Sequence, residues 1–234
     1  QLVRICIFHL HFSFIWKYID TKKEGLTMIQ RIQQIQQIVK EREITCLLHF
    51  TRVENLEGIM AHGIIPIATL KQYQIPVLSN DEFRWDGRTN ASCLSITFPN
   101  SLMFYKCRQA DTRADWVVLG LYPSVLWEKN CAFCKRNAAT KEISSKALNN
   151  LQSPAAFAGM FDELEGFDNR QVRGLQLGHT TDVQAEVLVF DVIEPRYIIG
   201  GVFNKPDIKA TYERFLEGKE SHLQGLNSGF FYRR

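Results

Sequence analysis

Five apolar runs of strand length set the strongest limit on what this chain can fold into. They lie at residues 44–50, 91–98, 116–122, 184–193 and 196–203, and the segments between them differ greatly in length and character. A doubly wound parallel sheet needs a regular alternation of strands and helices, which this order lacks. The sequence therefore predicts an α+β fold, with a split mixed or antiparallel sheet and flanking helices.

Local signals place helices between these runs. Isoleucines recur every third residue over residues 29–42, which predicts a helix with one apolar stripe. Thr51 and Glu54 have the spacing of a capping box for the helix after the first run, and Gly63 is a typical stop signal. Asn100 is a suitable N-cap for a helix that follows the second run.

Two stretches give weaker signals. Residues 140–180 are polar and contain scattered Gly, Pro, Asn and Ser, so we expect only short helices there, around 144–151 and 154–164. Residues 206–217 predict one more helix, and a loose tail is expected after it.

Residues 1–27 differ from the rest of the chain. Their apolar run at 5–16 is shorter than the ~20 residues of a membrane-spanning helix, and no small-residue cleavage site follows it. We therefore expect a native start at Met28, with residues 1–27 as an upstream extension and no contact with a membrane. No linker or repeat interrupts residues 28–234, which are expected to form a single domain.

Composition and cysteines restrict the function further. The net charge is only +3, so binding to nucleic acid would need a local basic patch. The six cysteines are irregularly spaced, which is typical of free thiols in a reducing cytoplasm. Cys131 and Cys134 form the one CxxC pair, but no second pair follows to complete a zinc site, and no metal is expected.

Common catalytic motifs are missing from the sequence: it contains no P-loop, GxGxxG, GxSxG or HExxH. Three places remain unusual. His49 ends an apolar run, Arg84 and Arg88 stand in one short loop, and Glu186 opens another apolar run. Taken singly, each has a common structural explanation, namely a hydrogen-bonded core histidine, solvated surface charges, and a salt bridge at a strand end.

Together these pieces, in this order, resemble the DarT family of toxin ADP-ribosyltransferases, which modify DNA bases with NAD⁺. The resemblance covers about residues 30–204 and rests on HFTRVENL, RWDGR, FPN, FCKRNAA and TDVQAEVLV. The first and last of these are the most specific. FCKRNAA includes Cys134, so the resemblance accounts for the CxxC without a metal.

The resemblance implies roles for individual residues. Glu186 resembles the family's catalytic glutamate, and Arg84 the loop arginine that meets the NAD⁺ phosphates and assists the reaction. His49 resembles the residue that holds the nicotinamide-side ribose, whereas Thr51 and Asn55 match polar positions that line the NAD⁺ pocket. A carboxylate suits this chemistry because it stabilises the cationic character that develops on the ribose.

A base inside a duplex cannot reach such a pocket, so the expected substrate is single-stranded or flipped-out DNA. Candidate DNA contacts are basic or aromatic residues outside the apolar runs: Arg88, Tyr105, Lys106 and Arg136, followed by Arg108, Arg113 and Lys135 for phosphates and by Trp85 and Phe133 for stacking on bases.

The family contains thymine-modifying and guanine-modifying branches, and RWDGR and FPN lean toward the guanine branch. An antitoxin of the ADP-ribosyl-hydrolase type is the partner that the resemblance implies, and the chain is expected to be a monomer. Two alternatives stay open: the same fold acting on RNA or protein, and an inactive module that binds NAD⁺ or nucleic acid.

Overall fold

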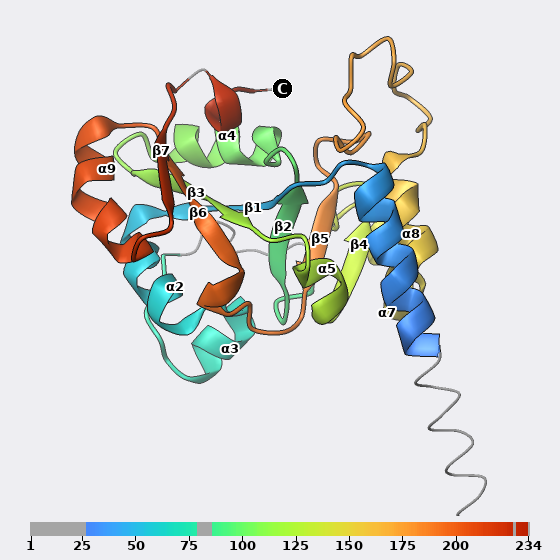
Figure 1. Cartoon of the computed structure of the whole chain (residues 1–234), viewed down its shortest axis with the longest axis horizontal. Helices are drawn as coiled ribbons and strands as arrows, with labels where there is room; N and C mark the ends of the chain where they lie inside the picture. The colour runs from blue at the N-terminus through green and yellow to red at the C-terminus, as the bar shows by residue number, and fades with distance from the viewer. Residues whose placement is uncertain (1–26, 79–85, 227, 234) are drawn as a thin grey trace, which may run out of the picture.

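The computed structural model describes residues 27–78, 86–226 and 228–233 of the chain (Figure 1). The proposed upstream extension, Arg84 and Trp85 lie outside these residues, apart from residue 27. Seven strands of the described part form one sheet in the order β4-β5-β2-β1-β3-β6-β7. The strands are β1 (Leu47–Arg52), β2 (Ser92–Ile96), β3 (Trp116–Leu121), β4 (Cys131–Cys134), β5 (Glu186–Val189), β6 (Ile198–Phe203) and β7 (Glu220–Leu223).

The sheet is mixed, as expected. Every neighbouring pair is antiparallel except β6 and β7, which run parallel. Each of the five apolar runs contains a strand, because its side chains are buried in the core of the sheet. The expected α+β class with a split mixed sheet is confirmed.

The split lies between β1 and β2. Strand β1 pairs with β3 along its whole length, from Leu47 to Arg52. With β2 it forms only two pairs, Leu47 with Ile96 and Leu48 with Ser95. From His49 onward the ladder between β1 and β2 is open, so the two strands leave room for a pocket within the sheet.

Strands β4 and β7 were not predicted from the sequence. The four residues of β4, CAFC, are all buried but too few to show a period. Strand β7 has the sequence ESHL, with mostly exposed side chains, and pairs only with β6 at the edge of the sheet. It takes the place of part of the expected loose tail.

Helices cover both faces and both ends of the sheet. The predicted stripe helix occupies residues 27–41 and lies beside α7 and α8, with α9 at the far end (Figure 1). The α-helices that follow are α2 (Leu56–His62), α3 (Ile67–Gln72), α4 (Ser101–Ala110), α5 (Val125–Glu128), α6 (Lys141–Ser144), α7 (Leu148–Leu151), α8 (Pro154–Ala158) and α9 (Pro206–Tyr212). Short 3₁₀ turns are η1 (Val53–Asn55), η2 (Gly159–Phe161), η3 (Pro195–Tyr197), η4 (Glu213–Leu216) and η5 (Gly229–Phe231).

The helix-end signals are partly right. Asn100 caps α4, since its side chain accepts a hydrogen bond from the Met103 N–H, and Gly63 ends α2 with a φ of 90°. The capping box at Thr51 is wrong. Thr51 belongs to β1, and Arg52 takes the cap position of η1 with no side-chain cap bond. The ladder with β3 extends through Arg52, so the strand prevails over the local cap.

The core has a main cluster and two smaller ones. Helix α2 contributes Leu56 and Met60 to the main cluster, together with Leu47 of β1. Helix α4 packs Phe104 against Leu48 of the same strand. Because neighbouring strand residues point to opposite faces, α2 and α4 lie on the two sides of β1. In the described part of the chain, no helix combines the length and apolar character needed to cross a bilayer.

Candidate active site

A pocket of about 860 Å³ opens where β1 and β2 separate. Its walls come from the end of β1, helix α2, strand β2, the start of β5 and residues 75–78. In the described part of the chain, five of the nine buried polar or charged side chains line it: Thr51, Ser92, Ser95, Asn100 and Glu186. Burying polar groups is costly unless they are bonded or used, so this concentration marks the pocket as functional.

Glu186 is the first residue of β5, and its side chain is 7% exposed. It pairs with Cys134 of β4, whereas pairing of β5 with β2 stops one step earlier, at Val187 and Leu94. One carboxylate oxygen, Oε1, lies 3.4 Å from Nδ2 of Asn100, and Oε2 accepts from the Ala138 N–H at 3.3 Å. The carboxylate is therefore held at the pocket wall by donors from two separate segments.

His49 stands at the point where the ladder between β1 and β2 opens. Its Nδ1 lies 3.0 Å from the Cys93 carbonyl oxygen. A carbonyl only accepts, so Nδ1 carries the proton and the neutral ring leaves Nε2 as an acceptor. Burial lowers the pKa of His49, against the weaker opposite effect of the Cys93 carbonyl. The ring thus stays neutral at pH 7, and its Nε2 can accept a hydrogen bond from a hydroxyl group of a ligand.

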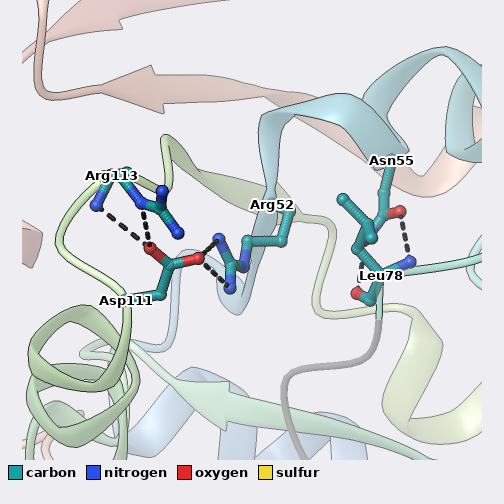
Figure 2. Close-up of polar contacts among 5 residues, drawn as sticks. All are labelled: Arg52, Asn55, Leu78, Asp111 and Arg113. Atoms are coloured by element: carbon teal, nitrogen blue, oxygen red, sulfur yellow. Dashed lines mark hydrogen bonds and ion pairs between the residues drawn. The ribbon is translucent and has the colours of Figure 1, made fainter.

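Thr51 and Asn55 also line the pocket, but their polar atoms have protein partners. The side-chain amide of Asn55 donates from Nδ2 to Thr51 Oγ1 at 3.0 Å and to the Leu78 carbonyl at 2.9 Å. Its Oδ1 accepts from the Leu78 N–H at 3.1 Å (Figure 2). Asn55 therefore fixes the 75–78 segment against α2, and both its amide hydrogens are already used.

The arginine loop is only partly described. Arg84 lies outside the described residues, and Asp86, two positions later in the sequence, lines the pocket. The Arg88 guanidinium donates from Nη2 to the Lys146 carbonyl at 3.2 Å and is not part of the pocket wall.

The candidate DNA contacts divide into two groups. Lys106 of α4 is exposed and lines the pocket, and its neighbour Tyr105 is exposed, with the Arg233 guanidinium 5.2 Å from its ring centroid. Arg136 instead donates to the Glu165 carbonyl and pairs with Glu142, and it does not line the pocket, although its neighbour Asn137 does. Helix α4 thus carries the contacts that border the site.

The secondary DNA candidates have other surroundings. Phe133 is 1% exposed inside β4, so the expectation that it stacks on bases is wrong. Arg108 donates to the Phe231 carbonyl at 2.8 Å and braces the C-terminal turn. Lys135 pairs with Glu142 at 2.7 Å. Arg113 is exposed and lies beside Asp111, which also binds Arg52 (Figure 2).

The CxxC pair lies in the core of the protein. Cys131 and Cys134 are the two ends of β4, and burial raises the pKa of each thiol to about 12. Both therefore stay protonated at neutral pH. Within the described ranges, no group of three His, Cys, Asp or Glu residues is placed to hold a metal ion.

Several polar residues of the pocket wall were not singled out from the sequence. Ser92 and Ser95 of β2 lie inside an apolar run and have no signal of their own. Asn137, in the turn after β4, belongs to the FCKRNAA segment but had no role assigned to it. Asn100 had a signal, its place as an N-cap, but the contact with Glu186 depends on a residue 86 positions away. Its position in the FPN segment was a second signal, but neither signal pointed to Glu186.

A sequence model described as "ssDNA thymidine ADP-ribosyltransferase, DarT" matches residues 48–228. Among solved structures, Thermus sp. 2.9 DarT in complex with ADP-ribosylated ssDNA has a TM-score of 0.54 at 14% identity, covering 82% of this chain and 97% of that one. The same protein in complex with NAD⁺ has a TM-score of 0.52 at 15% identity, covering 78% and 96%.

Thermosipho africanus DarTG in complex with ADP-ribose has a TM-score of 0.51 at 13% identity. The match covers 81% of this chain but 52% of that one, so the chain spans about half the length of that relative. At these identities the likeness is one of fold. No curated protein matches the chain.

Proposed function

This chain belongs to the DarT family of ADP-ribosyltransferases, and we propose that its pocket transfers ADP-ribose from NAD⁺ to a base of single-stranded DNA. The observation that carries the proposal is the buried Glu186 carboxylate, fixed by two donors in the same pocket as His49. NAD⁺ is the co-substrate, in line with the NAD⁺ bound to the Thermus sp. 2.9 relative. The alternatives of RNA, protein or no acceptor become outcomes of the test.

The proposed reaction breaks the bond between nicotinamide and C1 of its ribose. Nicotinamide leaves with the bonding electrons, and positive charge develops on the sugar ring. Glu186 stabilises that charge and accepts a hydrogen bond from a ribose hydroxyl. A ring nitrogen of the base then bonds to C1 and loses its proton, for which Glu186 or solvent is the acceptor.

NAD⁺ binding falls to the residues around this carboxylate. Nε2 of His49 accepts a ribose hydroxyl, since Nδ1 is already committed to Cys93. Thr51 contributes a hydroxyl to the wall, and Asn55 shapes the wall by holding Leu78. Arg84 is assigned to the NAD⁺ phosphates on the family resemblance, because a guanidinium fork matches phosphate oxygens bidentately.

The DNA strand is proposed to approach along α4. Lys106, which lines the pocket, is proposed to meet a phosphate next to the reacting nucleotide, and the exposed Tyr105 to stack on a flanking base. Arg88 and Arg136 were candidates as well, but both side chains bond to carbonyl groups of the protein. We therefore assign DNA contact to α4 first.

We propose thymine as the acceptor base, because the description of the matching family names thymidine. The RWDGR and FPN segments favour guanine, so both bases enter the test. The same family membership supports a toxin role, held in check by an antitoxin of the ADP-ribosyl-hydrolase type. We further propose that residues 28–234 act as one monomeric domain in the cytoplasm.

The test incubates the purified chain with NAD⁺ and one acceptor at a time. The acceptors are single-stranded oligonucleotides lacking either guanine or thymine, a duplex, an RNA and a protein mixture. Mass spectrometry is expected to find one added ADP-ribose on the thymine-containing single strand. Addition only to the guanine-containing strand would contradict the choice of base. Addition only to RNA or protein, or to nothing, would contradict the proposed substrate class.

A further inference from the structure

The turn between β2 and α4 adopts an unusual backbone conformation. Thr97 has a φ of 61°, a left-handed value that β-branched residues rarely adopt. The Phe98 N–H donates to the Ile96 carbonyl at 2.6 Å, two residues back, which closes a tight three-residue turn around Thr97. Such strain persists only where surrounding contacts enforce it, and it is common near active sites.

This turn folds the chain back onto the strand that it leaves. The Asn100 N–H donates to Ser95 Oγ at 2.9 Å, so Asn100 returns to the same level of the sheet as Ser95. In the register of β2 and β5, Ser95 is the position that would pair next with Glu186. The strained turn therefore delivers Asn100 to the end of the carboxylate strand.

The side chain of Asn100 has two different duties there. Its Oδ1 accepts from the Met103 N–H at 3.1 Å and caps α4. That cap turns Nδ2 toward Glu186, 3.4 Å from Oε1. Asn100 is 3% exposed, so the contact with the carboxylate is shielded from water.

We propose that Asn100 is a positioning residue for the ADP-ribosyl transfer, acting through Glu186. With the Ala138 N–H on Oε2, its amide fixes the plane of the carboxylate relative to the bound ribose. Small errors in that geometry are costly for a group that acts at the transition state. The inference rests on the proposed catalytic role of Glu186.

The two duties can be separated by substitution. Asn100→Asp keeps the cap, because aspartate is as good an N-cap as asparagine, but it replaces the donor to Glu186 with an acceptor. We expect kcat to fall roughly 100-fold and KM for NAD⁺ to change less than three-fold, both measured at a temperature where the variant is still folded. Tm should fall somewhat as well, because the substitution buries a second carboxylate beside Glu186.

Two matched variants control for charge and for cap loss. Asn149→Asp adds the same charge on the exposed face of α7. Ser153→Ala removes an equivalent side-chain cap from α8, where Ser153 Oγ accepts from the Ala156 N–H. Both are expected to keep kcat within two-fold of the wild type.

A third variant, Glu186→Gln, separates this inference from the proposed function. If Glu186→Gln abolishes transfer but Asn100→Asp keeps full kcat, the positioning role is wrong. If Glu186→Gln keeps full kcat, the proposed function itself is wrong. The positioning role would also be wrong if kcat fell in both Asn100→Asp and Ser153→Ala in proportion to their loss of Tm. Such a result would mean that the loss of activity reflects destabilisation alone.

Discussion

The side chain of Asn55 and the main chain of Leu78 form a two-way hydrogen bond, with Nδ2 to the carbonyl at 2.9 Å and the N–H to Oδ1 at 3.1 Å (Figure 2). It joins the start of α2 to the 75–78 segment, and both border the pocket proposed to bind NAD⁺. Asn55 thus shapes the pocket by holding the 75–78 segment in place.

Asn55→Ala removes these bonds and releases the 75–78 segment from α2. We expect a loss of about 1 kcal/mol of binding energy, so KM for NAD⁺ should rise roughly five-fold. Gln152→Ala, which removes an amide that bonds Asn130 far from the pocket, is the control. Steady-state kinetics check this, and an unchanged KM in Asn55→Ala would refute the role of the loop contact.

His49 predicts a pH dependence of stability. Burial holds its pKa below the ordinary value of 6.5. Below pH 6.5 the unfolded chain binds a proton at this histidine, whereas the folded chain does not. The free energy of unfolding therefore decreases as the pH falls, until the lower pKa of the folded state is reached. Above pH 6.5 this contribution is constant. His49→Gln should flatten the change in urea midpoint between pH 8 and pH 5.5. Parallel profiles for the two proteins would show that His49 is not the group concerned.

Replacing Gly63 with a larger residue is expected to create a steric clash. This glycine ends α2 at a φ of 90°, and an added Cβ would lie 2.5 Å from the Ile193 carbonyl oxygen. Gly218 has a φ of 81° but open space around it, so Gly218→Ala measures the cost of a positive φ without a steric contact. We expect Gly218→Ala to cost roughly 1–2 kcal/mol and Gly63→Ala at least about 1 kcal/mol more. Urea unfolding measures both losses of stability. Equal losses would show that the backbone at Ile193 moves aside without cost.

Lys106 predicts the salt dependence of DNA binding. If its ammonium meets one phosphate, Lys106→Ala should weaken binding to every single-stranded sequence alike and reduce the salt slope by roughly 0.7. Arg136→Ala serves as the control, since that guanidinium is bound to the Glu165 carbonyl and to Glu142. Fluorescence anisotropy with a labelled oligonucleotide at several salt concentrations measures the slope. A larger effect in Arg136→Ala would move the DNA path away from α4.

Strands with long apolar runs were predictable because burial in the sheet leaves a direct trace in composition. Strand β4 left none, since four residues cannot show a period. Strand β7 is polar, and it forms by pairing its backbone in parallel with β6 at the edge of the sheet. The capping box predicted at Thr51 was wrong because the capping pattern is local. The partner that holds Thr51 in the sheet, Val117, is distant in sequence.

The candidate site shows the same limit. Glu186 and His49 stood out because each is a titratable side chain in an apolar run, and the pocket brings both to its wall. Their proposed roles came from the family resemblance and not from the pattern alone. The link from Asn100 to Glu186 could not be predicted, because it joins two strand ends through a strained turn at Thr97. Sequence patterns give residue types along the chain, and such contacts arise only when the sheet assembles.

Glu186→Gln gives the most direct test of the proposed chemistry. The amide keeps the size of the side chain and its place on β5, but it removes the negative charge that stabilises the ribose cation. Single-turnover transfer of ADP-ribose from NAD⁺ to a thymine-containing single strand, followed by mass spectrometry, is the measurement. We predict a loss of at least about 1000-fold in rate with NAD⁺ still bound. Transfer at the wild-type rate would contradict the assignment of Glu186 as the catalytic residue.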